Sequence, residues 1–281
     1  MSWGASAALR AARRGQQNYR QKSALKSLER LLRLAGSDRA VTLIPLRVVW
    51  TDPVGLASAD ASGVVRCDDG CEYAVKDDSK HSKTMHSEWF CSRLAEAVGI
   101  AVPPFKICER MDGTLVFGSR WEGGVPNEQW YEMVQNGTLK FDDVKALLAN
   151  VFAFDNFVHN VDRHGKNYIV RPQKNGYALF AHDYSRAWLR HALPLTGQNT
   201  VTAARWITAN FGQYLNVAST EDTLDKIESI RDSDVSSIIN GHPPSWITKL
   251  EADAIVTWWS SPARKQRLDG IRQGIKDGSY L

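Results

Sequence analysis

The chain has 281 residues, of which 43% are hydrophobic and 23% are charged, a balance typical of a globular protein rather than a disordered or fibrous one. It contains no run of about 18 apolar residues and no apolar signal core at its N-terminus. We therefore expect neither a membrane span nor a secretory signal, and we predict a cytoplasmic protein with one large domain or two lobes.

The net charge of +4 is distributed unevenly along the chain. Residues 1–40 hold nine Lys and Arg against two Asp and Glu, so a basic arm precedes a mildly acidic body. Alanines and leucines predict a helix over residues 5–35, which Gly36 ends. Such an arm suits nucleic acid, an anionic membrane or an acidic protein partner, whereas its leucines favour packing on the body. Its Arg-rich, acid-poor composition is also that of an organellar transit peptide.

Residues 41–122 carry the pattern of a small β-rich lobe. A strand is expected at residues 41–50, where Pro45 favours a sheet edge or a break in the strand. A loop of small residues then leads into a hairpin of VVRC and CEYAVK around a DDG turn, and Lys76 ends the second strand. Helical spacing and turn residues predict one more helix and two more strands, at residues 86–98, 105–109 and 114–120.

The four cysteines form no CxxC pair; they are Cys67, Cys71, Cys91 and Cys108. Cys67 and Cys71 flank the DDG turn, which would allow them to face each other across the hairpin. In a cytosolic protein such residues are free thiols more often than a disulfide or a zinc site. We therefore expect free thiols.

Residues 123–281 are predicted to form a second, mostly helical lobe. A helix is expected from Asp142, its N-cap, to Val158, because apolar residues recur there every three or four positions. Further helices are expected after residue 190, near residues 200–215, 220–230, 232–240 and 246–273. The predicted fold class is therefore α+β, with a β-rich N-lobe, a helical C-lobe and the basic helical arm in front of both.

The segment from residue 159 to residue 185 reads HNVDRHGKNYIVRPQKNGYALFAHDYS. Asn167 follows Asp162 by five positions and precedes a short strand, and Asp183 ends the next strand after a PQKNG turn. Antiparallel pairing of these strands would place Asn167 and Asp183 side by side, with Asp162 close by. Two oxygen donors beside a third carboxylate suit Mg²⁺ and a general base for phosphoryl transfer.

Phosphoryl transfer from ATP also needs cations and hydrogen-bond donors on the phosphates, and earlier residues provide candidates. Lys76 is suited to the α- and β-phosphates, and Glu88, in the following helix, is suited to an ion pair with Lys76. In the loop 55–63, backbone N–H groups and the hydroxyls of Ser58 and Ser62 are predicted phosphate donors. Each of these residues is unremarkable alone, so the hypothesis depends on their order along the chain.

Other polar side chains of the segment each have two interpretations. His159 and His164 either brace the loop through hydrogen bonds or contact phosphate. Arg163 and Lys166 either add positive charge beside the phosphates or pair with nearby acids. Ser185 is suited to a local capping hydrogen bond.

At these residues the chain resembles the HipA-like kinases and, more distantly, the phosphoinositide-kinase-like branch with its DRHxxN loop. The catalytic-loop match, NVDRHGKN at residues 160–167, is specific, and Asp183 falls where the family's second metal-binding aspartate is expected. Supporting matches are a YAVK strand, a helix from SE to IAVP, an FGSR strand that enters the hinge, and PPSW, at residues 73–76, 87–103, 117–120 and 243–246.

The resemblance implies a two-lobed kinase fold that uses ATP and Mg²⁺ to phosphorylate Ser or Thr in a protein. The site residues that it implies are Asp162, Lys76 and Glu88 for catalysis, Lys76, Ser58, Ser62, Arg120, Trp121, His164 and Asn167 for the nucleotide, and Asn167 and Asp183 for the metal. Some relatives are toxins paired with a DNA-binding antitoxin, which makes an antitoxin a candidate partner. Two features depart from the family: the phosphate loop lacks GxGxxG, and a basic helix replaces the extra subdomain of the longer toxins.

Three alternatives stay open at this point. A lipid kinase would use the same residues, with the basic arm assisting membrane contact. A nucleotide-binding scaffold would have no need of Asp162. A metal phosphohydrolase would use His159, Asp162, His164 and the His182-Asp183 pair as ligands, although it would carry that pair on a helix.

Overall fold

The computed structural model describes most of the chain that follows residue 43. The described residues are 44–52, 61–121, 125–126, 129–174, 176–190, 193, 195 and 216–280. The predicted basic helix at 5–35, the helix predicted near 200–215 and Ser58 lie outside the described residues. Leu43–Leu281 form one compact unit of mixed α and β structure, which confirms the predicted α+β class.

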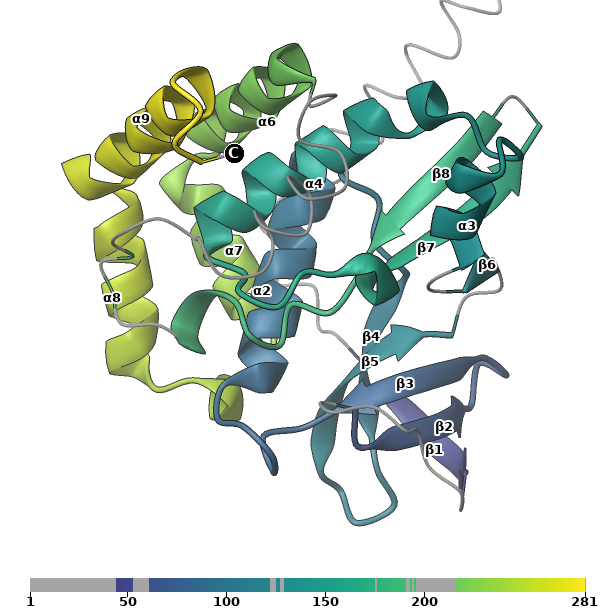
Figure 1. The fold of residues 1–281 in the computed structure, drawn as a ribbon. Helices are drawn as coiled ribbons and strands as arrows, with labels where there is room; N and C mark the ends of the chain where they lie inside the picture. Colours follow the sequence, from purple (N-terminus) through teal and green to yellow (C-terminus); the bar gives the residue numbers. More distant parts are fainter. Residues whose placement is uncertain are drawn as a thin grey trace, which may run out of the picture. The chain divides into compact units, whose positions relative to one another are not determined.

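Five short strands of this unit close into a barrel (Figure 1). They are β1 (Leu46–Thr51), β2 (Gly63–Cys67), β3 (Glu72–Lys76), β4 (Phe105–Glu109) and β5 (Leu115–Arg120). Around the barrel the order is β1-β2-β3-β5-β4, with antiparallel neighbours except for β1 and β4, whose parallel pairing closes it. The predicted hairpin around the DDG turn is confirmed as β2–β3. β1 begins directly after Pro45, because proline cannot donate a ladder hydrogen bond.

Mostly apolar side chains fill the barrel, since every second strand residue points inward. They are Val48, Val65, Cys67, Tyr73, Val75, Cys108 and Val116. The Sγ atoms of Cys67 and Cys108 lie 3.6 Å apart, so the buried neighbour of the Cys67 thiol is Cys108. All four cysteines are free thiols, as predicted, and Cys67 and Cys71 do face each other across the hairpin, where the Cys67 N–H donates to the Cys71 carbonyl oxygen at 3.0 Å.

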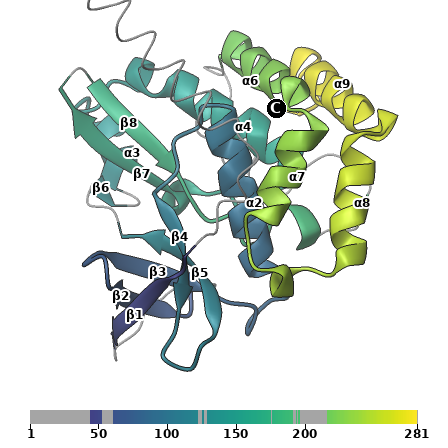
Figure 2. The same ribbon diagram turned by 180° about the vertical axis from the view of Figure 1, so that it is seen from behind.

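Helix α2 (Thr84–Ala97) follows the hairpin and packs against β5 and α7 (Figure 1 and Figure 2). The predicted apolar face is confirmed, because Phe90, Leu94 and Val98 are all buried. Gly99 ends the helix with φ +84°, a left-handed conformation that costs glycine little. Ser87 and Glu88 are buried on the same helix, so α2 carries polar groups into the interior.

The other elements that the structure describes are helices and one small sheet. The helices are α3 (Gln129–Gln135), α4 (Lys145–Val158), α6 (Val217–Ser229), α7 (Asp232–Asn240), α8 (Lys249–Trp259) and α9 (Pro262–Lys276), and the short 3-10 helices are η1 (Phe141–Asp143), η2 (Gly165–Asn167), η3 (Trp188–Arg190) and η5 (Pro244–Trp246). The sheet has the order β6-β7-β8, with β6 (Val125–Pro126), β7 (Tyr168–Gln173) and β8 (Gly176–Ala181).

None of the described helices combines the length and the apolarity that a membrane crossing needs.

Two predicted helix boundaries are wrong. Asp142 lies in η1, and α4 starts after it, with Val144 as an N-cap that makes no side-chain hydrogen bond. The Asp142 carboxylate instead pairs with Lys145 at 2.6 Å. The helix predicted at 246–273 is two helices, because Ser261 caps a new helix whose first residue is Pro262.

Gly118, in β5, provides a direct test of barrel packing. A Cβ atom at Gly118 would lie 2.5 Å from the Cys108 Sγ atom and 3.3 Å from the Tyr73 Cβ atom. We expect Gly118→Ala to lower the free energy of unfolding by about 1–3 kcal/mol, measured by urea denaturation. Adding Cys108→Ala should cost less than the two single changes together, because it removes the clash.

Gly270 is a matched control for this substitution. It lies at an exposed position of helix α9, with no atom within 4 Å of an added Cβ. Gly270→Ala should therefore raise the free energy of unfolding, by up to about 1 kcal/mol. Equal effects of the two glycine changes would contradict the packing described for β5.

Candidate active site

The site is built around Lys76, at the end of β3, which is only 7% exposed. Its Nζ atom lies 2.6 Å from Glu88 Oε1 and 2.7 Å from Asp183 Oδ1. Burial alone would lower the pKa of the Lys76 ammonium, but the Asp183 and Glu88 carboxylates outweigh it and hold this pKa above its ordinary value. The predicted Lys76–Glu88 ion pair is therefore present, and Asp183 joins it.

One ammonium between two carboxylates leaves one negative charge in excess. Asp183 keeps its charge: burial opposes ionisation, yet the Lys76 ammonium holds the pKa of Asp183 well below its ordinary value. The ionised form of Glu88, which is 2% exposed, is the one that is disfavoured. Burial raises the pKa of Glu88 to about 7, and the Lys76 ammonium only partly opposes this effect. The cluster is thus poised to accept another cation next to Asp183.

Helix α2 also holds the turn that follows Asp183. Glu88 Oε1 accepts a hydrogen bond from the Tyr184 backbone N–H at 2.9 Å. Ser87 Oγ lies 2.7 Å from both the Tyr184 and the Ala187 carbonyl oxygens, so its single O–H group is shared between these two acceptors. These bonds fix Asp183 in a left-handed conformation, φ +66°, which is uncommon for a residue with a side chain.

The predicted hairpin is confirmed and brings Asn167 next to Asp183. Strand β7 pairs with β8 so that Tyr168 faces Ala181. Just beyond this pair, the His182 N–H donates to the Asn167 carbonyl oxygen at 3.1 Å. Asn167 therefore lies at the start of one strand and Asp183 just past the end of its neighbour, as the spacing predicted.

The residues at these strand ends fit a magnesium ion. Asn167 Nδ2 donates to the Asp162 carbonyl oxygen at 2.8 Å, which leaves its Oδ1 atom as an acceptor with no hydrogen bond among the described residues. Asp183 Oδ1 accepts hydrogen bonds from Lys76 and from the Ser185 hydroxyl, at 2.7 Å each. Among the described residues, the second carboxylate oxygen of Asp183 is therefore left to bind a metal ion. An amide oxygen and an ionised carboxylate are the hard ligands that Mg²⁺ prefers.

The loop that carries Asp162 starts at His159, the left-handed C-cap of α4, with φ +54°. The Asp162 N–H donates to Asn160 Oδ1 at 3.2 Å. His164 Nδ1 accepts from the Lys166 N–H at 3.2 Å, which caps η2 and agrees with the bracing interpretation of His164. The Asp162 carboxylate itself is 24% exposed and faces Arg186, with Oδ2 and Nη1 3.3 Å apart.

Arg163 points inward and not toward a phosphate position. It is completely buried, with Nε 2.7 Å and Nη2 3.1 Å from the two Asp155 carboxylate oxygens of α4. Its Nη1 donates to the carbonyl oxygens of Asn167 and His182. Burial opposes its charge, but the Asp155 carboxylate raises the pKa of the Arg163 guanidinium. Arg163 thus joins α4 to both strand ends of the site, as one of its two predicted interpretations allowed.

A second buried arginine comes from α9, more than 100 residues later in the chain. Arg267 Nε donates to the Phe157 carbonyl oxygen at 2.8 Å, and Nη2 donates to that of Asn156 at 2.6 Å. These are terminal carbonyls of α4, which lack partners within the helix. Arg267 Nη2 also lies 3.4 Å from His159 Nδ1, a cationic neighbour that does not suit a metal-ligating histidine. Among the described residues, no three His, Cys, Asp or Glu side chains group as metal ligands.

Three other residues predicted to bind the nucleotide are not placed beside Lys76 by contacts of this kind: Ser62, Arg120 and Trp121. Ser62 is placed beside β3, where its hydroxyl donates to the Val75 carbonyl oxygen at 3.2 Å and accepts from Arg110 at 2.8 Å. Lys76 faces Phe117, whereas Arg120 lies three residues, about 10 Å, further along β5. Trp121 follows Arg120 and is 55% exposed, and its backbone N–H donates to the Glu72 carbonyl oxygen.

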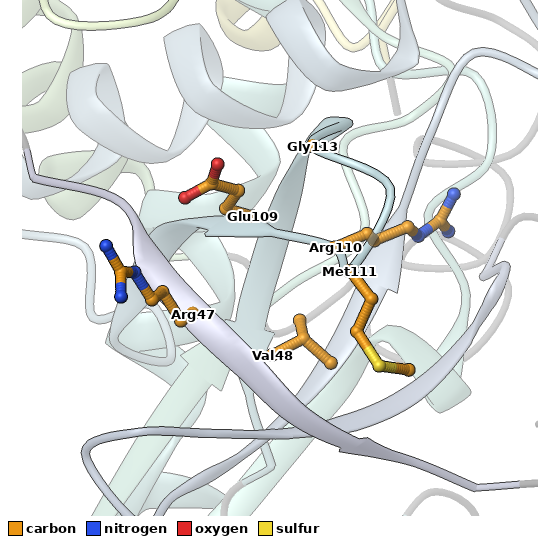
Figure 3. Close-up of a pocket in the computed structure, with 6 residues that line it drawn as sticks. All are labelled: Arg47, Val48, Glu109, Arg110, Met111 and Gly113. Atoms are coloured by element: carbon orange, nitrogen blue, oxygen red, sulfur yellow. The ribbon is translucent and has the colours of Figure 1, made fainter.

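A hollow of about 300 Å³ lies elsewhere on the barrel, beside β1 and the β4–β5 turn. It is lined by Arg47, Val48, Glu109, Arg110, Met111 and Gly113 (Figure 3). Figure 3 shows the Arg47 and Arg110 guanidinium groups directed away from each other. Arg110 is bound to Asp77 at 2.7 Å, and no lining residue belongs to the Lys76 site.

Sequence reasoning missed Ser87, Asp155, Arg186 and Arg267. Ser87 adjoins Glu88 in the SE motif, which was a usable signal. Asp155 is one helical turn before the loop, and a carboxylate on an otherwise apolar helix indicates a buried partner. No local pattern marks Arg186 or Arg267, because the partner of Arg186 is 24 residues away and those of Arg267 are 72 or more residues away.

The structure thus brings together four residues of the predicted site: Lys76, Glu88, Asn167 and Asp183. A family model described as HipA-like kinase matches residues 63–269. Since this match covers well over half of the chain, the chain belongs to the HipA-like kinase family, as predicted from its motifs, and its class is that of the phosphotransferases.

Comparison with solved structures gives matches that include two bacterial proteins. The proinflammatory kinase CtkA of Helicobacter pylori matches with a TM-score of 0.56 and 12% identity, over 84% of this chain and 99% of CtkA. HipA of Shewanella oneidensis MR-1, from a toxin–antitoxin complex with HipB and operator DNA, matches with a TM-score of 0.46 and 13% identity, over 72% of this chain and 60% of that chain. The CtkA match confirms a kinase-like α+β fold. Curated protein sequences give no significant match.

Replacement of Arg163 tests its inward role. Arg163→Met would leave the fully buried Asp155 carboxylate unpaired, so we expect a loss of about 3–5 kcal/mol in the free energy of unfolding, measured by urea denaturation. Adding Asp155→Leu should recover part of the loss. A variant of normal stability with weakened ATP affinity would instead support the rejected phosphate-contact interpretation.

The raised pKa of Glu88 predicts a pH-dependent stability. Because the folded pKa is about 7 and the ordinary value is 4.5, the folded state binds this proton more tightly. The Glu88 contribution is fully present below pH 4.5 and is lost as the pH rises through 7. Glu88→Gln keeps an uncharged acceptor, so its free energy of unfolding relative to wild type should improve from pH 5 to pH 8, by on the order of 1–3 kcal/mol. If the free energy of unfolding of Glu88→Gln differs from that of wild type by the same amount at pH 5 and at pH 8, this prediction is wrong.

Proposed function

We propose that this chain is a kinase that uses ATP and Mg²⁺ to phosphorylate a Ser or Thr hydroxyl of a protein. The observation that carries the proposal is the buried Lys76 ammonium held between Glu88 and Asp183, next to Asn167 and beside the loop of Asp162. The barrel with α2 would act as the N-lobe and the helical part as the C-lobe, with the nucleotide between them.

Each residue of the site has a role in this proposal. Lys76 would bind the α- and β-phosphates, while Glu88 keeps its ammonium in place. Asn167 and Asp183 would hold the metal ion, which supplies positive charge to the phosphates when bound. Asp162 would accept the proton of the acceptor hydroxyl, and its partly exposed carboxylate is accessible to one. Predicted nucleotide contacts of Ser58, Ser62, Arg120, Trp121 and His164 belong to the same proposal.

The acceptor and the partners are proposed at a coarser level. A phosphoinositide or other lipid acceptor would use the same site, so the two acceptors differ only in what becomes labelled. The basic arm, residues 1–40, is the proposed contact for an acidic partner, an antitoxin, nucleic acid or an anionic membrane. A cytoplasmic location remains a prediction.

Transfer is tested by incubating the full chain with ATP labelled on the γ-phosphate, with and without Mg²⁺, and then with a cell lysate. We expect Mg²⁺-dependent label on Ser or Thr residues, identified by mass spectrometry. Label in lipid would move the proposal to a lipid kinase, and binding of ATP without any turnover would make the chain a scaffold.

Two variants separate catalysis from metal binding. Asp162→Ala should reduce turnover by about 10²–10⁴-fold with ATP binding largely intact, because only the base is lost. Asp183→Asn should weaken Mg²⁺-dependent ATP affinity, measured by calorimetry. Asp253→Asn, which alters an exposed carboxylate paired with Lys249 on α8, is the matched control and should match wild type. Normal turnover by Asp162→Ala would overturn the assignment of the base.

A further inference from the structure

Arg186 is a charged residue of the site region that the proposed mechanism does not yet use. Its guanidinium Nη1 lies 3.3 Å from Asp162 Oδ2, across the space between the turn after Asp183 and the loop. The side chains of Arg186 and Asp162 are 34% and 24% exposed, so the pair borders solvent. An acceptor hydroxyl within hydrogen-bonding reach of Asp162, roughly 2.6–3.2 Å, would therefore enter beside Arg186.

The backbone that carries Arg186 is fixed at both ends. Before it, Glu88 and Ser87 of α2 bind the backbone N–H and carbonyl of Tyr184. After it, Ser87 binds the Ala187 carbonyl, and the buried Trp188 stacks on Phe90 with ring centroids 4.7 Å apart. The turn 183–187 thus extends two charged side chains from one rigid support, Asp183 toward Lys76 and Arg186 toward Asp162.

We infer that Arg186 is a positioning residue for Asp162, which orients the carboxylate and offsets its negative charge while the acceptor enters. The inference rests on the proposed function. In that step the acceptor oxygen forms a bond to the γ-phosphorus and its proton passes to Asp162. The bond from the γ-phosphorus to the bridging oxygen breaks, and its electron pair leaves with ADP.

The charges around the site explain why such a cation is needed. Glu88, Asp162 and Asp183 are three carboxylates, and Lys76 is committed to two of them. Arg163 points inward and pairs with Asp155, so its positive charge does not offset the charge of the three site carboxylates. ATP adds further negative charge next to Asp162, and a guanidinium at 3.3 Å limits the resulting repulsion.

An ion pair this exposed contributes little to stability, which allows its functional role to be separated from folding. We expect Arg186→Ala to change the free energy of unfolding by less than about 1 kcal/mol. Its kcat, measured as ADP formed from Mg²⁺-ATP with water as acceptor and as label on the chain itself, should fall by about 10–100-fold. KM for ATP should stay within about twofold, because the Lys76 and Asp183 contacts remain. Added guanidinium ion should restore part of the rate, and Arg186→Lys should be intermediate.

The control is Arg231→Ala, which removes an exposed Arg–Asp pair at the start of α7 and should leave kcat unchanged. A second comparison tests whether Arg186 acts through Asp162. Asp162→Ala with Arg186→Ala should turn over no more slowly than Asp162→Ala alone, because the second change has nothing left to position.

Four outcomes would overturn the inference: unchanged kcat in Arg186→Ala, a raised kcat, a raised KM for ATP with normal kcat, or independent effects in the double variant. The proposed function fails differently, since it requires that the wild-type chain consume ATP at all. No turnover by wild type would overturn both, whereas an active wild type with an equally active Arg186→Ala would overturn the role of Arg186 alone.

Discussion

The structure depends on one ammonium group that serves two carboxylates in a nearly dry environment. Lys76 extends from the barrel, Glu88 from α2 and Asp183 from the turn after β8, so a single Nζ atom ties three separate parts of the chain together. A buried charge of this kind is costly unless it is paired, which makes the position of each partner interdependent. Removing Lys76 would leave two buried carboxylates without their cation, whereas removing either carboxylate would leave Lys76 paired with the other.

The same contact determines how α2 and the 183–187 turn act together. Glu88 binds Lys76 with the oxygen that also accepts from Tyr184, and Ser87 holds the carbonyls on either side of Arg186. The helix therefore sets the direction of Asp183 and of Arg186 in one step. Arg163 and Arg267 perform the corresponding task for the loop, because they bind backbone carbonyls at the strand ends and at the C-terminus of α4. Two buried arginines and one buried lysine thus support a site whose reactive groups are mostly acidic.

Much of this could be predicted from local pattern. The hairpin around DDG, α2 with its apolar face and the pairing of β7 with β8 follow from alternation, helical spacing and turn residues. The closeness of Asn167 and Asp183 followed directly from that pairing. The start of α4 was misplaced at Asp142, since a residue with a good capping side chain lay within a 3-10 turn and bonded Lys145 instead. The long C-terminal helix predicted from periodicity is two helices, because Ser261 and Pro262 start a new helix. Periodicity alone does not detect this break.

By itself, the sequence determined the kind of chemistry and the order of its parts. These parts are a strand that ends at Lys76, a helix that contains Glu88, the DxxxxN loop, and the predicted metal ligand Asp183 after a hairpin. Each of these is a short-range feature, encoded within a few residues, although Lys76 and Asp183 are 107 positions apart. The tertiary structure decided which charges face the site and which face the interior. Arg163 and Arg186 are both near the loop in sequence, yet one is fully buried against Asp155 and the other meets Asp162 at the surface. That difference depends on partners from α4, α2 and the turn, and the free energy of burying a charge is set by those partners and not by the residue type.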